Sequence, residues 1–80
     1  MLTRYIQAAM RRARYEIFPE DGTFYGEIPG FQGVWANAVT LEGCREELEE
    51  VLEEWILLGV AKNHPLPVVD GIDLVVREVA

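Results

Sequence analysis

Apolar residues recur along the first third of the chain with two different spacings. Over residues 2–10 they fall every three or four positions, which predicts a short amphipathic helix. Over residues 15–18 and again over 23–28 they alternate with polar residues, which predicts two strands. The intervening residues 19–22 read Pro-Glu-Asp-Gly, a turn-forming combination, so we expect the two strands to pair as an antiparallel hairpin.

The rest of the chain predicts one more strand, a long helix and a final strand. A Pro/Gly-rich break over residues 29–33 precedes a third strand over residues 34–39. Thr40 is placed to cap a long helix that begins at the next residue and ends at roughly Gly59, before Asn63, Pro65 and Pro67, which cannot prolong a helix. A β-branched stretch over residues 72–79 predicts the last strand. The order is therefore α-β-β-β-α-β, a single small α+β domain in which an antiparallel sheet packs against one long acidic helix.

Length and composition are those of one small domain without disulfide bridges. The chain has 80 residues, enough for one sheet and one or two helices, and half of them are apolar. Cys44 is the only cysteine, so no internal disulfide can form, which favours a cytoplasmic location. No apolar run approaches the about 20 residues of a membrane-spanning helix. A domain this small gains stability from self-association and its sheet edges need covering, so we expect a homo-oligomer.

The long helix separates its charged residues from its apolar ones. At about 100° per residue, seven glutamates fall within one broad arc. They are Glu42, Glu46, Glu47, Glu49, Glu50, Glu53 and Glu54, and the opposite side carries Leu41, Cys44, Leu48, Val51, Leu52 and Trp55. The arc fits either a solvated exterior or a docking surface for a basic partner, and the residues alone leave both open. A metal site is not expected, because carboxylates radiating from one helix diverge.

The basic residues cluster at the other end of the sequence. The net charge is −7, which disfavours binding to nucleic acid or acidic membrane. The cluster Arg11, Arg12 and Arg14 follows the first predicted helix. We expect it to complement the helix C-terminus or to pair with glutamates of another subunit, with nucleic-acid binding as a weaker alternative.

Three aromatic residues near the predicted hairpin, Tyr25, Phe31 and Trp35, raise the possibility of base stacking on a sheet face. No Lys or Arg lies between residues 23 and 39 to bind a phosphate backbone. We therefore expect these aromatics to make core or dimer contacts.

No combination of residues with recognisable catalytic chemistry is present. The sequence has no serine, and about 20 residues of helix, or about 30 Å, separate Cys44 from the only histidine, His64. We expect Cys44 in the core and His64 exposed in a loop. The glycines fit no phosphate-binding loop. We therefore expect no enzyme activity, no catalytic residue, no metal and no cofactor.

Several short motifs occur in an order that resembles a known family. They are Tyr15-Glu16-Ile17-Phe18, Asp21-Gly22, Ile28-Pro29-Gly30-Phe31-Gln32-Gly33, Thr40-Leu41-Glu42 and Pro65-Leu66-Pro67. Together they resemble the HicB-like antitoxins, which show a strand, a D-G turn, a strand ending in I-P-G-x-x-G, a T-x-E-E-A helix start and a P-x-P. The resemblance makes residues 1–80 a single HicB-like domain, with a helical extension over 1–12, the family-like core over 14–67 and a final strand within 68–80.

The chain departs from the family pattern around the start of the long helix. Gly43 and Cys44 replace the usual glutamate and alanine, and Val39 stands where a glycine commonly precedes the threonine. Many relatives carry a DNA-binding segment after the P-x-P, for which residues 68–80 leave no room. The resemblance therefore carries no expectation of operator binding.

The resemblance implies a partial RNase H-like fold without that enzyme's active site, oligomerisation, and neutralisation of a small basic RNase toxin of the HicA type. An acidic helix would suit such a partner. The expected partner-binding residues are Glu46, Glu50, Glu53 and Glu54, and secondarily Tyr25 and Glu27 on the hairpin.

Two alternatives to the antitoxin hypothesis are kept. The first is an orphan oligomeric interaction domain with no toxin partner, whose glutamates serve solubility. The second is a metal-dependent nuclease in which Glu16, Glu27 and Asp73 would gather on strands to hold Mg²⁺.

Overall fold

The computed structural model describes residues 2–72. Within that range two helices and three strands follow one another as α1 (Leu2–Arg11), β1 (Arg14–Ile17), β2 (Phe24–Glu27), β3 (Trp35–Ala38) and α2 (Leu41–Ala61). The α+β fold class and the order of these elements confirm the sequence-based prediction. The last predicted strand, over residues 72–79, lies outside the described residues except for its first position.

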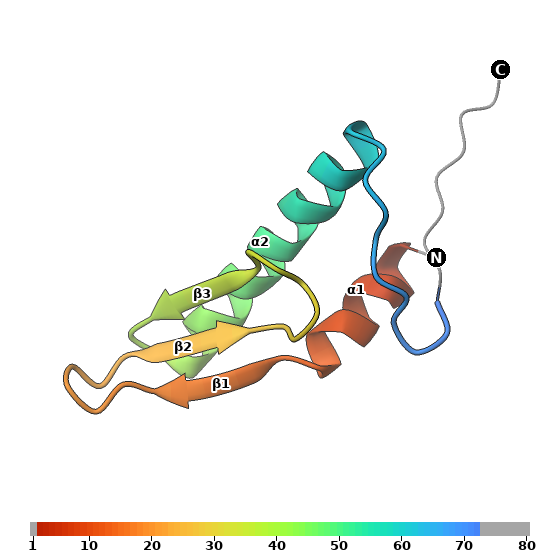
Figure 1. Ribbon diagram of the computed structural model, residues 1–80. Coiled ribbons are helices and arrows are strands. Elements are labelled where there is room, and N and C mark those ends of the chain that lie inside the picture. The colour runs from red at the N-terminus through yellow and green to blue at the C-terminus, as the bar shows by residue number, and fades with distance from the viewer. Residues whose placement is uncertain (1, 73–80) are drawn as a thin grey trace, which may run out of the picture.

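The three strands form an antiparallel sheet in the order β1-β2-β3, and α2 covers one of its faces (Figure 1). Gly26 in β2 lies opposite Tyr15 in β1 and Ala36 in β3. This row faces α2, because a Cβ placed on Gly26 would lie 3.1 Å from Cys44 Sγ. Side chains alternate along a strand, so the neighbouring residues Tyr25 and Glu27 point away from α2, onto a face that no helix of residues 2–72 covers.

The core is formed where α1, α2 and the loop between β2 and β3 meet. Tyr5 of α1 is fully buried, and its hydroxyl donates a hydrogen bond to the carbonyl oxygen of Pro67, 2.6 Å away. Phe31 of the loop lies between the rings of Tyr5 and Trp55, with centroid distances of 6.2 and 5.2 Å. Helix α2 contributes its buried stripe of Cys44, Leu48, Leu52 and Ile56. Segments from both ends of the described chain therefore share one core.

Helix α2 begins as predicted. Thr40 has an extended backbone and its Oγ1 accepts the N–H of Gly43 at 3.0 Å, which satisfies one of the unpaired donors of the first turn.

The predicted end of α2 at Gly59 is wrong, because the helix runs on to Ala61. Asn63 takes the left-handed conformation (φ 55°) that closes it, and the N–H of His64 then reaches the carbonyl oxygen of Gly59 at 2.8 Å. Gly59 has a different role. A Cβ at this position would lie 2.9 Å from Leu66 Cδ2, so the glycine lets the chain that returns after the helix pack against it.

Replacing Thr40 by alanine is expected to lower the free energy of unfolding by about 1 kcal/mol, because the N–H of Gly43 loses its acceptor. Thr40→Ser keeps a side-chain oxygen at the cap and is the matched control, expected to retain most of the stability. Urea denaturation followed by circular dichroism measures both variants. Equal losses in the two would show that the cap oxygen is not the cause.

Candidate protein-binding surface

The seven glutamates of α2, which we call the acidic face, are all exposed to solvent, as predicted: Glu42, Glu46, Glu47, Glu49, Glu50, Glu53 and Glu54. They lie on the side of α2 away from the buried Cys44, Leu48 and Leu52. Among the residues predicted on the apolar side of α2, Leu41 is exposed instead of buried, because it lies at the very start of the helix with 43% of its surface accessible. Val51 and Trp55 are half-buried.

Within residues 2–72 no Lys or Arg forms an ion pair with the glutamates of the acidic face, although Arg45 lies beside Glu42, Glu46 and Glu49. The ion pairs of this range join Asp70 to Arg11 and Arg12, and none involves a glutamate of α2. Like-charged neighbours such as Glu46 and Glu50 are one helical turn apart, and each such pair costs a few tenths of a kcal/mol. With seven glutamates and Arg45 beside them, the face keeps a net negative charge that a cationic surface would relieve.

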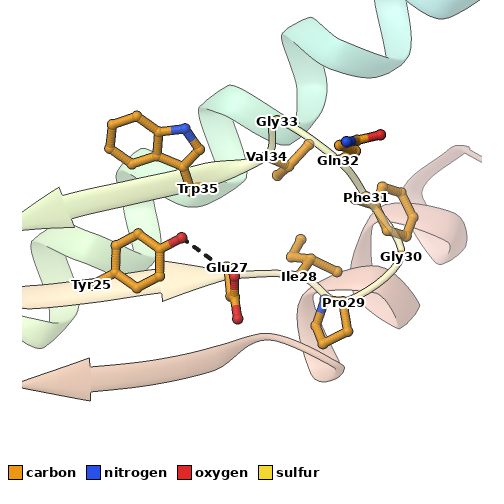
Figure 2. Close-up of a pocket in the computed structure, with 10 residues that line it drawn as sticks. All are labelled: Tyr25, Glu27, Ile28, Pro29, Gly30, Phe31, Gln32, Gly33, Val34 and Trp35. Carbon is orange, nitrogen blue, oxygen red and sulfur yellow. Dashed lines mark hydrogen bonds between the residues drawn. The ribbon is translucent and has the colours of Figure 1, made fainter.

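The uncovered side of the sheet presents a second feature, a stack of the aromatic rings of Phe18, Tyr25 and Trp35, which we call the aromatic row. The centroid of Tyr25 is 5.7 Å from that of Phe18 and 6.1 Å from that of Trp35, with interplanar angles of 25° and 26°. Trp35 is 55% exposed even in this stack. Figure 2 shows Tyr25 and Trp35 side by side on neighbouring strands. Exposed stacked aromatics of this kind are enriched at protein interfaces.

Tyr25 and Glu27, the secondary predicted partner residues, interact with each other on this uncovered side. The Tyr25 hydroxyl donates to Glu27 Oε2 at 3.3 Å. Partial desolvation, followed by the negative charge of Glu27, raises the pKa of Tyr25 above its usual value. Because α2 covers the opposite face of the sheet, these two residues are not brought together with Glu46, Glu50, Glu53 and Glu54. The predicted site is thus divided between two sides of the molecule.

The I-P-G-x-x-G motif forms the loop at the end of the aromatic row (Figure 2). Gly30 and Gly33 have φ values of +87° and +92°, which side-chain-bearing residues rarely adopt. These turns bury the apolar Ile28, Phe31 and Val34. Between the loop, Tyr25 and Trp35 the surface is hollowed, with a volume of about 480 Å³.

The structure separates the three aromatics that sequence reasoning treated together. Phe31 is 4% exposed and belongs to the core, whereas Trp35 is more than half exposed and Tyr25 is half-buried in the aromatic row. The predicted core contact is therefore confirmed for Phe31 alone.

Cys44 and His64 occupy the environments predicted for them. Cys44 is fully buried, and this burial, with a smaller effect of the Glu47 charge, raises the pKa of its thiol. His64 is exposed in the loop after α2, as predicted. Among residues 2–72 no three His, Cys, Asp or Glu side chains are grouped so that they could hold a metal ion. Two of the three carboxylates in the nuclease hypothesis, Glu16 and Glu27, lie on the uncovered side of the sheet. The third, Asp73, lies outside the described residues.

The arginine cluster has a role that the sequence did not indicate. Arg12 Nη2 lies 2.9 Å from Asp70 Oδ1, and Arg11 Nη2 lies 3.8 Å from Asp70 Oδ2. Asp70 and Gly71 both have positive φ and form a two-residue turn closed by the Val69–Ile72 bridge. The end of α1 is therefore tied to the chain after α2 within the same molecule. Exposed pairs of this kind contribute about 0.2–1 kcal/mol.

These features define a class of small α+β domains: a three-stranded antiparallel sheet, one covering helix and a glycine-rich loop that buries Ile28, Phe31 and Val34. The chain belongs to the UPF0150-like family, whose model matches residues 4–67. It is similar to TTHA0281 from Thermus thermophilus, known from a crystal structure. The two share 38% sequence identity and a TM-score of 0.86, over 96% of this chain and 95% of that one. Among curated proteins none matches significantly. None of the helices within residues 2–72 is long and apolar enough to cross a membrane.

Proposed function

We propose that this protein is a non-enzymatic binding module, an antitoxin-like protein that neutralises a small basic RNase toxin of the HicA type. The observation that carries the proposal is the acidic face, which has seven exposed glutamates and no ion pair within the described residues. The resemblance to HicB-like antitoxins supplies the identity of the partner.

The physical case for a cationic partner rests on charge placement. Helix α2 is anchored by fully buried Cys44, Leu48 and Leu52, so its exposed glutamates are free of any role in packing. A predominantly negative surface of this kind, with Arg45 as its cation, speeds the encounter with an oppositely charged protein and repels anionic competitors such as RNA. Occluding a cationic RNA-binding surface would stop an RNase without any chemistry by the antitoxin.

The predicted partner residues lie on two sides of the molecule, so one partner surface cannot contact all of them. Glu46, Glu50, Glu53 and Glu54 share one exposed helix surface and can meet one partner together, whereas Tyr25 and Glu27 lie across the sheet. We therefore assign the primary contact to the acidic face.

The test begins with the tagged protein at native expression in its host, followed by mass spectrometry of what co-purifies. The proposal requires a small basic protein whose RNase activity the purified domain inhibits. Recovery of the bait alone would favour an orphan oligomeric domain. Mg²⁺-dependent cleavage of an RNA–DNA hybrid by the pure protein would instead support the nuclease alternative.

Charge reversal then locates the contact. The double variant Glu50→Lys/Glu54→Lys is expected to fold normally and to weaken toxin binding at least about tenfold, equal to about 1.4 kcal/mol, measured by titration calorimetry. The matched control Glu16→Lys/Glu27→Lys makes the same change in net charge on the uncovered side of the sheet. A larger loss in the control than in the α2 variant would move the contact to the aromatic row.

A further inference from the structure

The part of the chain that the structure describes leaves the outer edge of β3 unpaired. Within residues 2–72, β3 pairs with β2 only, and its sequence Trp-Ala-Asn-Ala contains no charge and no proline. The opposite edge strand, β1, carries Arg14 and Glu16, and charged residues of this kind discourage pairing with another chain. One of the two sheet edges is thus blocked by charge and the other is not.

The direction of the backbone groups of β3 follows from the hydrogen bonds of β2. The N–H of Phe18 donates to the carbonyl oxygen of Thr23 at 2.9 Å, so Thr23 turns its backbone groups toward β1. The next residue, Phe24, turns its groups toward β3, and its carbonyl oxygen also accepts the Asn37 side-chain amide at 2.8 Å.

The backbone groups that point outward then belong to alternate residues. Phe24 pairs with Ala38 and Gly26 with Ala36, so these two alanines use their N–H and C=O groups within the sheet. Trp35 and Asn37, and Val39 just past the strand end, present theirs to the outside. The chain is still extended at Thr40 (φ −125°, ψ 156°), so the edge continues beyond β3.

We propose that two copies of this chain pair antiparallel through the outer edge of β3, with the two-fold axis at Asn37. In this register Trp35 of each copy lies opposite Val39 of the other, on the uncovered side of the sheet. The outward-pointing backbone groups of Trp35, Asn37 and Val39 then all meet outward-pointing groups of the other copy. Two hydrogen bonds for each of the three residue pairs give about six inter-chain backbone hydrogen bonds. The two three-stranded sheets become one continuous sheet, and the aromatic rows of both copies lie on the same side of it.

Exposure selects this register. Trp35 is 55% exposed and Val39 79%, which makes them the large apolar residues of this edge that most need cover. In the register centred on Asn37, Trp35 of each copy packs against Val39 of the other. The interface therefore contains two Trp–Val contacts, a favourable type of cross-strand pair. A register shifted by two residues would place Trp35 against Asn37 and Val39 against Gly33, and it would cover neither as well.

Dimerisation through β3 and toxin binding are expected to respond to salt in opposite directions. Each chain carries a net charge of −7, yet the pairing edge is neutral. Two copies therefore repel one another at long range, and salt that screens this repulsion strengthens the dimer. Binding of a cationic toxin to the acidic face weakens with salt. The dimer does not depend on the proposed function and can be tested without a toxin.

The first measurement is sedimentation equilibrium of the whole protein at increasing concentration, at about 0.02 M and about 0.5 M salt. We expect a reversible species of twice the 9.1 kDa chain mass, with a Kd that falls as salt rises. Val39→Lys places a charge at an already exposed position and is expected to raise this Kd at least about tenfold. Ile17→Lys, the same change on the β1 edge at a residue 61% exposed, is the control and should leave the Kd unchanged. A monomer at all concentrations, or equal effects of the two variants, would overturn the proposal.

A disulfide test checks the register directly. Asn37 lies on the proposed two-fold axis, where paired Cα atoms are about 5.5 Å apart, within the range that a disulfide spans. Asn37→Cys is therefore expected to form a covalent dimer under mild oxidation at least about tenfold faster than Val39→Cys, whose position faces Trp35 instead. The buried Cys44 gives the background in the wild type. Faster cross-linking of Val39→Cys would rule out this register.

Discussion

Replacing Leu48 by alanine is expected to lower the free energy of unfolding by about 2–5 kcal/mol. Leu48 is fully buried on the sheet-facing side of α2, between the equally buried Cys44 and Leu52. The loss combines the transfer of the removed methyl groups with the cavity that the packed surroundings fail to fill. A domain this small has little stability to spare, so this one change removes a large fraction of it.

Leu57→Ala provides the control for Leu48. Leu57 is on the same helix but is 65% exposed, so its truncation is expected to change stability by less than about 0.5 kcal/mol. Urea denaturation monitored by circular dichroism measures both. If the two variants lost the same amount, α2 would not be packed against the sheet as described.

Gly26→Val is expected to cost about 1–3 kcal/mol through overpacking. The Cβ alone would lie 2.9 Å from Tyr15 Cε1 and 3.1 Å from Cys44 Sγ, and valine adds two further methyl groups. Either Tyr15 moves outward or α2 lifts from the sheet, and both lose buried contacts. The thermal midpoint and the urea midpoint should fall together.

A double-mutant cycle assigns the cause. Combining Gly26→Ala with Cys44→Ala removes the sulfur that the new Cβ would meet, so the pair should be less destabilised than the sum of the two single variants. Strict additivity would mean that the cost at Gly26 comes from the strand backbone or from Tyr15 and not from the approach of α2.

The elements were predictable from the sequence because each has a local signal. The change from helical to alternating spacing near Arg14 marks the end of α1, and Thr40 accepts the backbone N–H that a capping residue should accept. The end of α2 carries two competing local signals, Gly59 and Asn63, and the helix closes at the second. Gly59 reads as a stop, but it is needed for the close approach of Leu66, which only the folded chain brings near.

The candidate surface was predictable only in part, for a related reason. The arc of glutamates follows from helix geometry alone, so their exposure was correctly predicted. That Tyr25 and Glu27 lie across the sheet from them depends on which face α2 covers, which no short stretch of sequence specifies. The pairing of Arg12 with Asp70 joins residues 58 positions apart and is a property of the tertiary fold.

The hydrogen bond from Tyr5 to Pro67 also bears on the order of events during synthesis. The two residues are 62 positions apart, and Tyr5 is fully buried only when α1, α2 and the segment around Pro67 are together. Helix α1 leaves the ribosome first but must wait for nearly the whole described chain before its partners exist. We therefore expect this domain to fold late and cooperatively, and a nascent chain stalled inside α2 to leave α1 without its core contacts and open to proteolysis.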